Sequence, residues 1–149
     1  MQKKLLNSEM IDQIKQLFDA QIHFPVELIY FANEDNCETC AETHQLLEEI
    51  SSLSDKIHLI YYDIDKHADQ AQSYNVHFTP GLVIAGSDED KILDYGIRMM
   101  GTPSGYEFSS LLQAIIFVSK RESGLKAMIS EQLSKLKEPV RFQVFVTPT

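Results

Sequence analysis

Two cysteines with two residues between them are the side chains of this sequence best suited to covalent chemistry. They lie in the segment Cys37-Glu38-Thr39-Cys40, which opens a helical pattern and predicts Cys37 at the first helical position. Unpaired amides and the positive end of the helix dipole favour a thiolate at such a position. We therefore expect Cys37 to attack disulfides as a nucleophile, and Cys40, one turn later, to resolve the mixed disulfide.

The elements on either side of the cysteine pair strengthen this interpretation. Residues 26–31 form a short apolar run after Pro25, which predicts a buried strand. Apolar residues recur at helical spacing after the pair, at Leu46, Leu47, Ile50 and Leu53. A Cys-x-x-Cys between a buried strand and an amphipathic helix is more specific than the motif alone.

The remaining patterns predict one α/β sandwich with a mixed sheet. Helices are expected over Ser8–Asp19, over the polar stretch Lys66–Tyr74, and after a capping box of Ser104 and Glu107. Strands are expected over Ile57–Asp65, Leu82–Ala85 and Lys91–Ile97, with a turn over Gly86–Asp90. Beyond Gly124 we expect an apolar helix, with Leu125, Met128, Ile129, Leu133 and Leu136 spaced for burial, and a strand over Val140–Val146.

A second candidate site is the dipeptide Thr79-Pro80, which precedes the third predicted strand. A proline there is commonly an ordinary turn residue. The functional alternative is a cis peptide bond that places this loop beside the cysteine pair. Thr79 would then offer backbone groups to an extended substrate segment.

The order of these elements resembles the thioredoxin fold. More closely, the chain resembles the amino-terminal unit of the glutaredoxin-like protein disulfide oxidoreductases, which carry two thioredoxin units in tandem. The matching stretches are Leu28–Phe31 with Cys37–Cys40, Tyr74–Pro80, Tyr95–Phe108 and Val144–Thr149. The resemblance implies a thioredoxin-fold domain over residues 1–122, with the start of a second unit over 123–149. It also implies Cys37 as nucleophile, Cys40 as resolving thiol, and Thr79-Pro80 as the substrate-facing loop.

The chain departs from this family in several places. Thioredoxin's Trp before the first cysteine is replaced by Asn36, and the acid buried beneath the pair by Tyr30 or Phe31. The second Cys-x-x-Cys, which relatives carry just beyond Thr149, is absent. Three explanations stay open: a piece of a longer protein, a naturally short protein, or a reading frame stopped at a selenocysteine codon.

The composition and net charge of the chain limit the kinds of partner that we expect. The 149 residues include 13 Lys and Arg against 22 Asp and Glu, a formal charge of −9. Such a surface repels phosphate backbones and anionic lipid, so we expect no nucleic-acid or membrane partner. We expect a cytoplasmic protein with protein dithiols as substrates and no bound cofactor, because the cysteines carry the electrons. A flavin-dependent reductase is the upstream partner that the resemblance implies. The last strand is expected either to fold back on the sandwich or to pair with another copy.

Acidic residues surround the cysteines in sequence. Glu34, Asp35, Glu38 and Glu42 oppose the helix terminus and disfavour the thiolate. We therefore expect Cys37 to be less acidic than in strongly oxidising relatives, and to use anionic glutathione poorly.

Two other functions fit parts of the same pattern. Cys37, Cys40 and His44 could bind zinc with a remote histidine, His58, His67 or His77; without a second cysteine pair we expect no metal. The alternative that is not an enzyme is a non-catalytic interaction domain with a vestigial cysteine pair.

Overall fold

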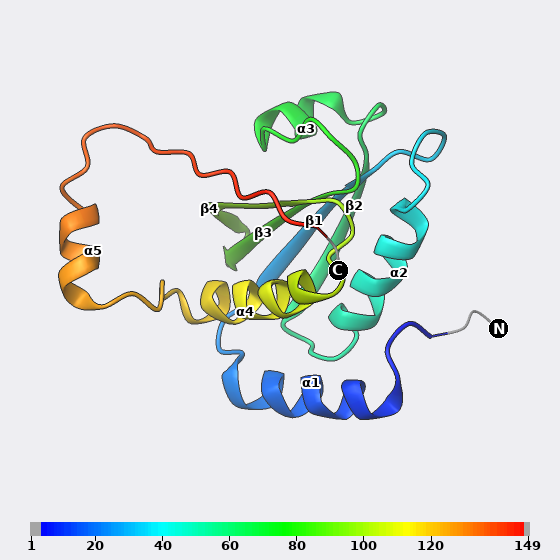
Figure 1. Ribbon diagram of the computed structural model, residues 1–149, viewed down its shortest axis with the longest axis horizontal. Coiled ribbons are helices and arrows are strands. Elements are labelled where there is room, and N and C mark those ends of the chain that lie inside the picture. Colours follow the sequence, from blue (N-terminus) through cyan, green and yellow to red (C-terminus); the bar gives the residue numbers. More distant parts are fainter. Residues whose placement is uncertain (1–3, 148–149) are drawn as a thin grey trace.

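A four-stranded mixed sheet forms the centre of the protein in the computed structural model, which describes residues 4–147 (Figure 1). Its order is β2-β1-β3-β4. The strands are β1 (Val26–Ala32), β2 (Ile57–Asp63), β3 (Gly81–Asp88) and β4 (Lys91–Met100). β1 runs parallel to β2 and antiparallel to β3, and β3 is antiparallel to β4. The predicted mixed sheet is therefore confirmed.

Five helices accompany these strands among the described residues. They are α1 (Ser8–Gln21), α2 (Cys40–Ser51), α3 (Ala68–Ser73), α4 (Tyr106–Lys120) and α5 (Ala127–Leu133). Side chains of α1, α2 and α4 share one core with alternate residues of β1 and β3, whereas α3 closes a smaller core on the opposite face (Figure 1). β1 is buried along its whole length because it has a strand on each side and a core on each face.

The register of β1 places two loops at the same edge of the sheet. Phe31 pairs with Gly81, so the residues that follow β1 and those that precede β3 leave the sheet together. The first of these loops leads to the cysteines and the second contains Thr79-Pro80. The antiparallel pairing of β1 and β3 therefore brings the two candidate sites to one end of the molecule.

Local details differ from the sequence predictions where a backbone partner decides the outcome. The turn between β3 and β4 is shorter than expected, because Gly86 pairs with Leu93 and so belongs to β3. The predicted capping box at Ser104 is wrong: α4 has Gly105 as its N-cap, without a side-chain cap bond. The first helix, in contrast, starts as expected, with the Asn7 side chain accepting a hydrogen bond from the Met10 amide.

The region after Gly124 does not form the predicted buried helix and strand. α5 is short and has no buried residue, and residues 140–146 form no strand. The segment returns beside the first turns of α4, where Phe145 and Val146 line an open groove with Tyr106. An alternating pattern becomes a strand only when another strand binds its amides and carbonyls, and this segment pairs with neither β2 nor β4. Across residues 4–147, no helix has the length and apolar character that crossing a membrane requires.

Candidate functional site

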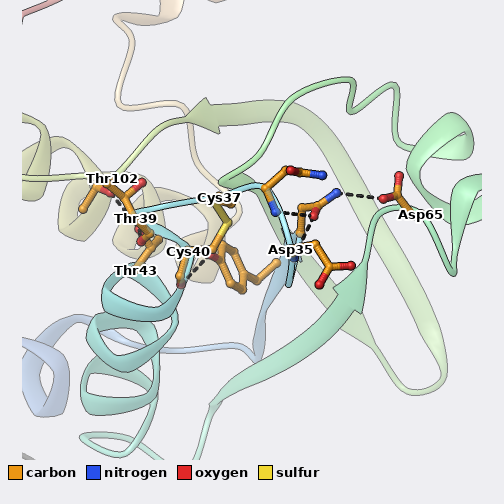
Figure 2. The surroundings of a disulfide bond; sticks show 10 residues. Asp35, Cys37, Thr39, Cys40, Thr43, Asp65 and Thr102 are labelled. Atoms are coloured by element: carbon orange, nitrogen blue, oxygen red, sulfur yellow. Dashed lines mark hydrogen bonds between the residues drawn. A yellow bond between two sulfur atoms is a disulfide. The ribbon is translucent and has the colours of Figure 1, made fainter.

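Cys37 and Cys40 form a disulfide at the start of α2, with their Cα atoms 5.4 Å apart (Figure 2). Cys40 is the first residue of α2 and is buried, whereas Cys37 lies in the preceding turn and is half-buried. The prediction that Cys37 is the first helical residue is therefore wrong by three positions. Cys37 still lies close to the helix amino terminus, separated from it by Glu38 and Thr39. It is the more exposed of the two cysteines, as attack on an external disulfide requires.

The loop before Cys37 is ordered by Asn33. Its side-chain oxygen accepts hydrogen bonds from the amides of Asp35 and Asn36, at 3.0 and 2.9 Å. Its side-chain nitrogen donates to the Asp65 carboxylate at 2.8 Å, which ties the loop to the residues after β2. This is an Asx-type arrangement, and it sets the path of the chain into the cysteine turn.

Charge near the pair is mainly negative in sequence. Asp35, Glu38 and Glu42 are exposed, and the nearby Glu34 forms an ion pair of 2.7 Å with Lys66. These exposed carboxylates are screened by water and salt, so each weakens a Cys37 thiolate only slightly. The expected acidity of Cys37 stays a prediction.

Beneath the pair lies Tyr30 of β1. Its hydroxyl donates a hydrogen bond of 2.9 Å to the Cys40 carbonyl. Phe31 instead belongs to the smaller core on the opposite face of the sheet, so Tyr30 is the residue under the cysteines. Burial raises the pKa of the Tyr30 phenol, against a lowering effect of the Thr43 hydroxyl, and the phenol therefore remains a donor.

Threonine hydroxyls connect the cysteine helix to a second loop. Thr43 donates to the carbonyl of Thr39, the N-cap residue of α2, at 2.8 Å. Its oxygen also lies 2.8 Å from the Thr102 hydroxyl, in the loop between β4 and α4 (Figure 2). Because the single Thr43 proton is used toward Thr39, Thr102 is the donor in the second contact. Sequence reasoning did not single out either residue, since neither spacing nor composition reveals a contact across 59 positions.

Thr79-Pro80 is a cis peptide bond, as the functional alternative required. Pro80 is buried and Thr79 is half-buried, whereas the neighbouring Phe78 is exposed. The Pro80 carbonyl accepts a hydrogen bond of 2.8 Å from the Gly101 amide. The residue after Gly101 is Thr102, so the proline loop, the β4–α4 loop and the first turn of α2 form one connected set of contacts.

The histidines that could have completed a zinc site have other contacts. His44 stacks on the Tyr30 ring, His58 binds the Glu27 carboxylate, and His67 and His77 bind Asp63 and Asn75. The described part of the chain holds no group of three or more His, Cys, Asp or Glu side chains arranged for a metal ion.

Comparison with known proteins identifies relatives over nearly the whole chain. No family model matches. The alkyl hydroperoxide reductase protein AhpF of Staphylococcus aureus is 30% identical over 145 residues, which are 97% of this chain and 25% of that protein. The chain thus spans about a quarter of the length of this curated relative.

Two solved structures share the fold. The protein disulfide oxidoreductase from Aeropyrum pernix superposes with a TM-score of 0.77 and 25% identity, over 88% of this chain and 55% of that one. AhpF from Enterococcus faecalis gives a TM-score of 0.76 and 26% identity, over 88% of this chain and 61% of that one. The Cys37–Cys40 pair fits the Cys-x-x-Cys redox motif. The chain therefore has a thioredoxin-like fold and is similar to protein disulfide oxidoreductases and to part of the alkyl hydroperoxide reductase protein AhpF.

Proposed function

We propose that the protein is a thiol–disulfide oxidoreductase that exchanges electrons with protein dithiols in the cytoplasm. The observation that carries the proposal is the Cys37–Cys40 disulfide at the start of α2, with Cys37 more exposed than Cys40. The similarity to disulfide oxidoreductases supports it. Cys37 is the nucleophile and Cys40 the resolving thiol.

The reaction runs in two exchanges. In the reduced protein, the Cys37 thiolate attacks a substrate disulfide, so that one substrate sulfur leaves as a thiolate and a mixed disulfide forms. The Cys40 thiolate then attacks the Cys37 sulfur. The second substrate thiolate leaves, the substrate has gained two electrons, and the Cys37–Cys40 disulfide is restored. A flavin-dependent reductase that passes electrons through a dithiol would return the pair to its reduced form.

The loop containing Thr79 and Pro80 is the proposed substrate-binding element. Its support is its position, because the pairing of Phe31 with Gly81 brings it to the sheet edge from which the cysteine loop departs. The half-buried Thr79 can offer backbone groups to an extended segment of the substrate. The exposed Phe78 adds an apolar side chain beside it.

The region after residue 122 is proposed as the start of a second unit. Its apolar side chains, among them Phe142 and Phe145, are exposed. Because exposed side chains of this kind favour association, we propose that the segment contributes to contact between two copies of the chain.

Reduction of insulin disulfides tests the proposed activity. With dithiothreitol as the electron source, the wild-type protein should speed insulin precipitation, and Cys37→Ser should abolish the acceleration. Cys40→Ser should instead accumulate a mixed disulfide that mass spectrometry detects at Cys37. An inactive wild-type protein whose cysteines are fully reduced would favour the non-catalytic interaction domain.

A further inference from the structure

The hydroxyl of Tyr30 makes a contact that the exchange chemistry described above does not use. Tyr30 is completely buried in β1, and its hydroxyl donates to the carbonyl of Cys40 at 2.9 Å. The bond joins the central strand of the sheet to the residue that resolves the mixed disulfide. The other interactions of the Tyr30 side chain are aromatic packing and a contact with the Thr43 hydroxyl.

Neighbouring rings hold the Tyr30 side chain in place. The His44 ring lies nearly parallel to it, with the ring centres 5.8 Å apart and the planes at 9°. The Tyr61 ring packs from β2 at 6.1 Å. β1 itself is paired on both sides, with β2 and β3. The hydroxyl is therefore presented from one of the most constrained positions of the protein.

We propose that Tyr30 is a positioning residue for the resolving step: its hydroxyl holds Cys40 in place for attack on the Cys37 sulfur. The proposal rests on the function proposed above and assigns a role within the same site. Tyr30 acts through the backbone of Cys40 and does not itself exchange electrons.

Cys40 needs such a restraint because the ends of helices tend to fray. Cys40 is the first residue of α2, where the backbone has fewer helical hydrogen bonds than in the middle of the helix. When the disulfide opens, the covalent restraint on this turn is lost. The Tyr30 bond then keeps Cys40 within reach of Cys37, which raises the rate of an intramolecular attack by fixing the geometry in advance.

A second contact holds the other end of the same turn. Thr43 donates to the Thr39 carbonyl at 2.8 Å, and Thr39 directly precedes Cys40. Tyr30 and Thr43 thus restrain neighbouring carbonyls from different elements. Because burial favours the neutral phenol and raises its pKa, Tyr30 keeps its donor proton and the bond persists while the cysteines change state.

The two exchanges can be measured separately with 2,2′-dithiodipyridine, a neutral disulfide that releases a coloured thione in each step. The first thione reports attack by Cys37, and the second reports attack by Cys40 on the mixed disulfide. In Tyr30→Phe, which keeps the buried ring and removes one oxygen, the second release should slow about two- to tenfold, as expected for one lost hydrogen bond. The first release should keep its wild-type rate.

Tyr61→Phe is the matched control. It removes a hydroxyl from the neighbouring ring, which packs on Tyr30 without a hydrogen bond to Cys40, and both releases should proceed as in the wild type. As a second variant, 3,5-difluorotyrosine in place of Tyr30 keeps the ring and hydroxyl but ionises at lower pH. Because burial disfavours the charged phenolate, this phenol stays neutral at neutral pH and still donates to Cys40, so its second release should keep the wild-type rate.

The outcomes separate the two proposals. An unchanged second release in Tyr30→Phe, equal slowing of both releases, or a slow second release in the difluorotyrosine variant at neutral pH would overturn the positioning role. If the reduced wild-type protein released no thione at all, the proposed oxidoreductase function would fail instead. In Tyr30→Phe, a normal first release with a slow second release supports the inference, because general loss of structure would affect both steps.

Discussion

The hydroxyl oxygens of Thr43 and Thr102 lie 2.8 Å apart, although 59 residues separate them in the chain. Thr43 is buried in α2, and Thr102 belongs to the loop between β4 and α4. The adjacent Gly101 amide binds the Pro80 carbonyl. Through this pair, the turn that carries the cysteines and the loop that carries the cis proline are held by one local network.

We expect Thr43→Val to destabilise the protein more than Thr102→Val. Thr43→Val removes two hydrogen bonds and leaves the Thr39 carbonyl without its side-chain donor, whereas Thr102→Val removes one, worth about 0.5–1.5 kcal/mol. Urea unfolding of both variants and of the double variant measures the difference. The double variant should cost less than the sum of the single ones, since they share a bond. Strict additivity would show that the two hydroxyls do not interact.

The lack of space for a side chain at Gly81 predicts that a substitution there disturbs the proline loop. A Cβ atom at Gly81 would lie 2.7 Å from both the Phe78 carbonyl oxygen and a Val76 methyl carbon. Gly81→Ala should therefore displace the loop, lower the free energy of unfolding by about 1–3 kcal/mol, and slow insulin reduction. Gly86→Ala is the control in the same strand, because its nearest contact would be 3.5 Å. Equal behaviour of the two variants would contradict this prediction.

The acidic surroundings of Cys37 predict a preference for cationic disulfides. The reduced protein should react with cystamine about three- to tenfold faster than with oxidised glutathione at low salt, after correction for their intrinsic reactivities. Added salt should reduce the ratio. The combined change of Asp35→Asn and Glu38→Gln should reduce it as well, and Asp12→Asn, on the exposed face of α1, should not. A rate ratio that changes neither with salt nor with these substitutions would refute the electrostatic explanation.

His58 predicts how stability changes with pH. The Glu27 carboxylate, hydrogen-bonded to the ring at 2.9 Å, raises the pKa of His58 above its ordinary value of 6.5. Since the folded state favours the protonated ring, this stabilisation is fully present below about pH 6.5 and is lost as the pH rises through the higher folded pKa. The effect should be small, because half of the His58 side chain is exposed.

Urea unfolding of the wild type and of His58→Gln between about pH 5.5 and 8.5 checks this dependence. The difference between the two proteins should be larger at the acidic end. His77→Gln is the control, because it replaces an exposed histidine whose hydrogen bond goes to Asn75 and not to a carboxylate. An imidazole titration by NMR that placed the pKa of His58 below 6.5 would contradict the assignment.

The exposed apolar side chains after Gly124 predict association of the chain. Sedimentation of the 149-residue chain should show a dimer or larger species at micromolar concentration. The combined change of Phe142→Asp and Phe145→Asp, at side chains that are more than four-fifths exposed, should shift the protein to the monomer without changing its unfolding midpoint. A wild-type protein that stays monomeric across this concentration range would contradict the proposed contact between two copies.

Much of the site could be predicted from residue types and short spacings. The cysteine pair and the buried strand before it have local signals, and the structure confirms the strand. The sequence left Thr79-Pro80 open between an ordinary turn and a cis bond, and the structure shows the cis bond. The choice between Tyr30 and Phe31 could not be made in the same way. Successive residues of a strand face opposite sides of the sheet, so only the tertiary structure shows that Tyr30 faces the cysteines.

The sequence by itself determined the cysteine chemistry and the order of the elements as far as α4, because both depend on neighbouring residues: helical or strand periodicity, turn residues and the two-residue cysteine spacing. The tertiary structure alone decided which distant groups meet. It pairs Thr43 with Thr102, places the Tyr30 hydroxyl under Cys40, and leaves residues 140–146 without a strand partner. Hydrogen bonds and burial depend on groups that the folding of the whole chain brings together, so a local sequence pattern does not predict these contacts.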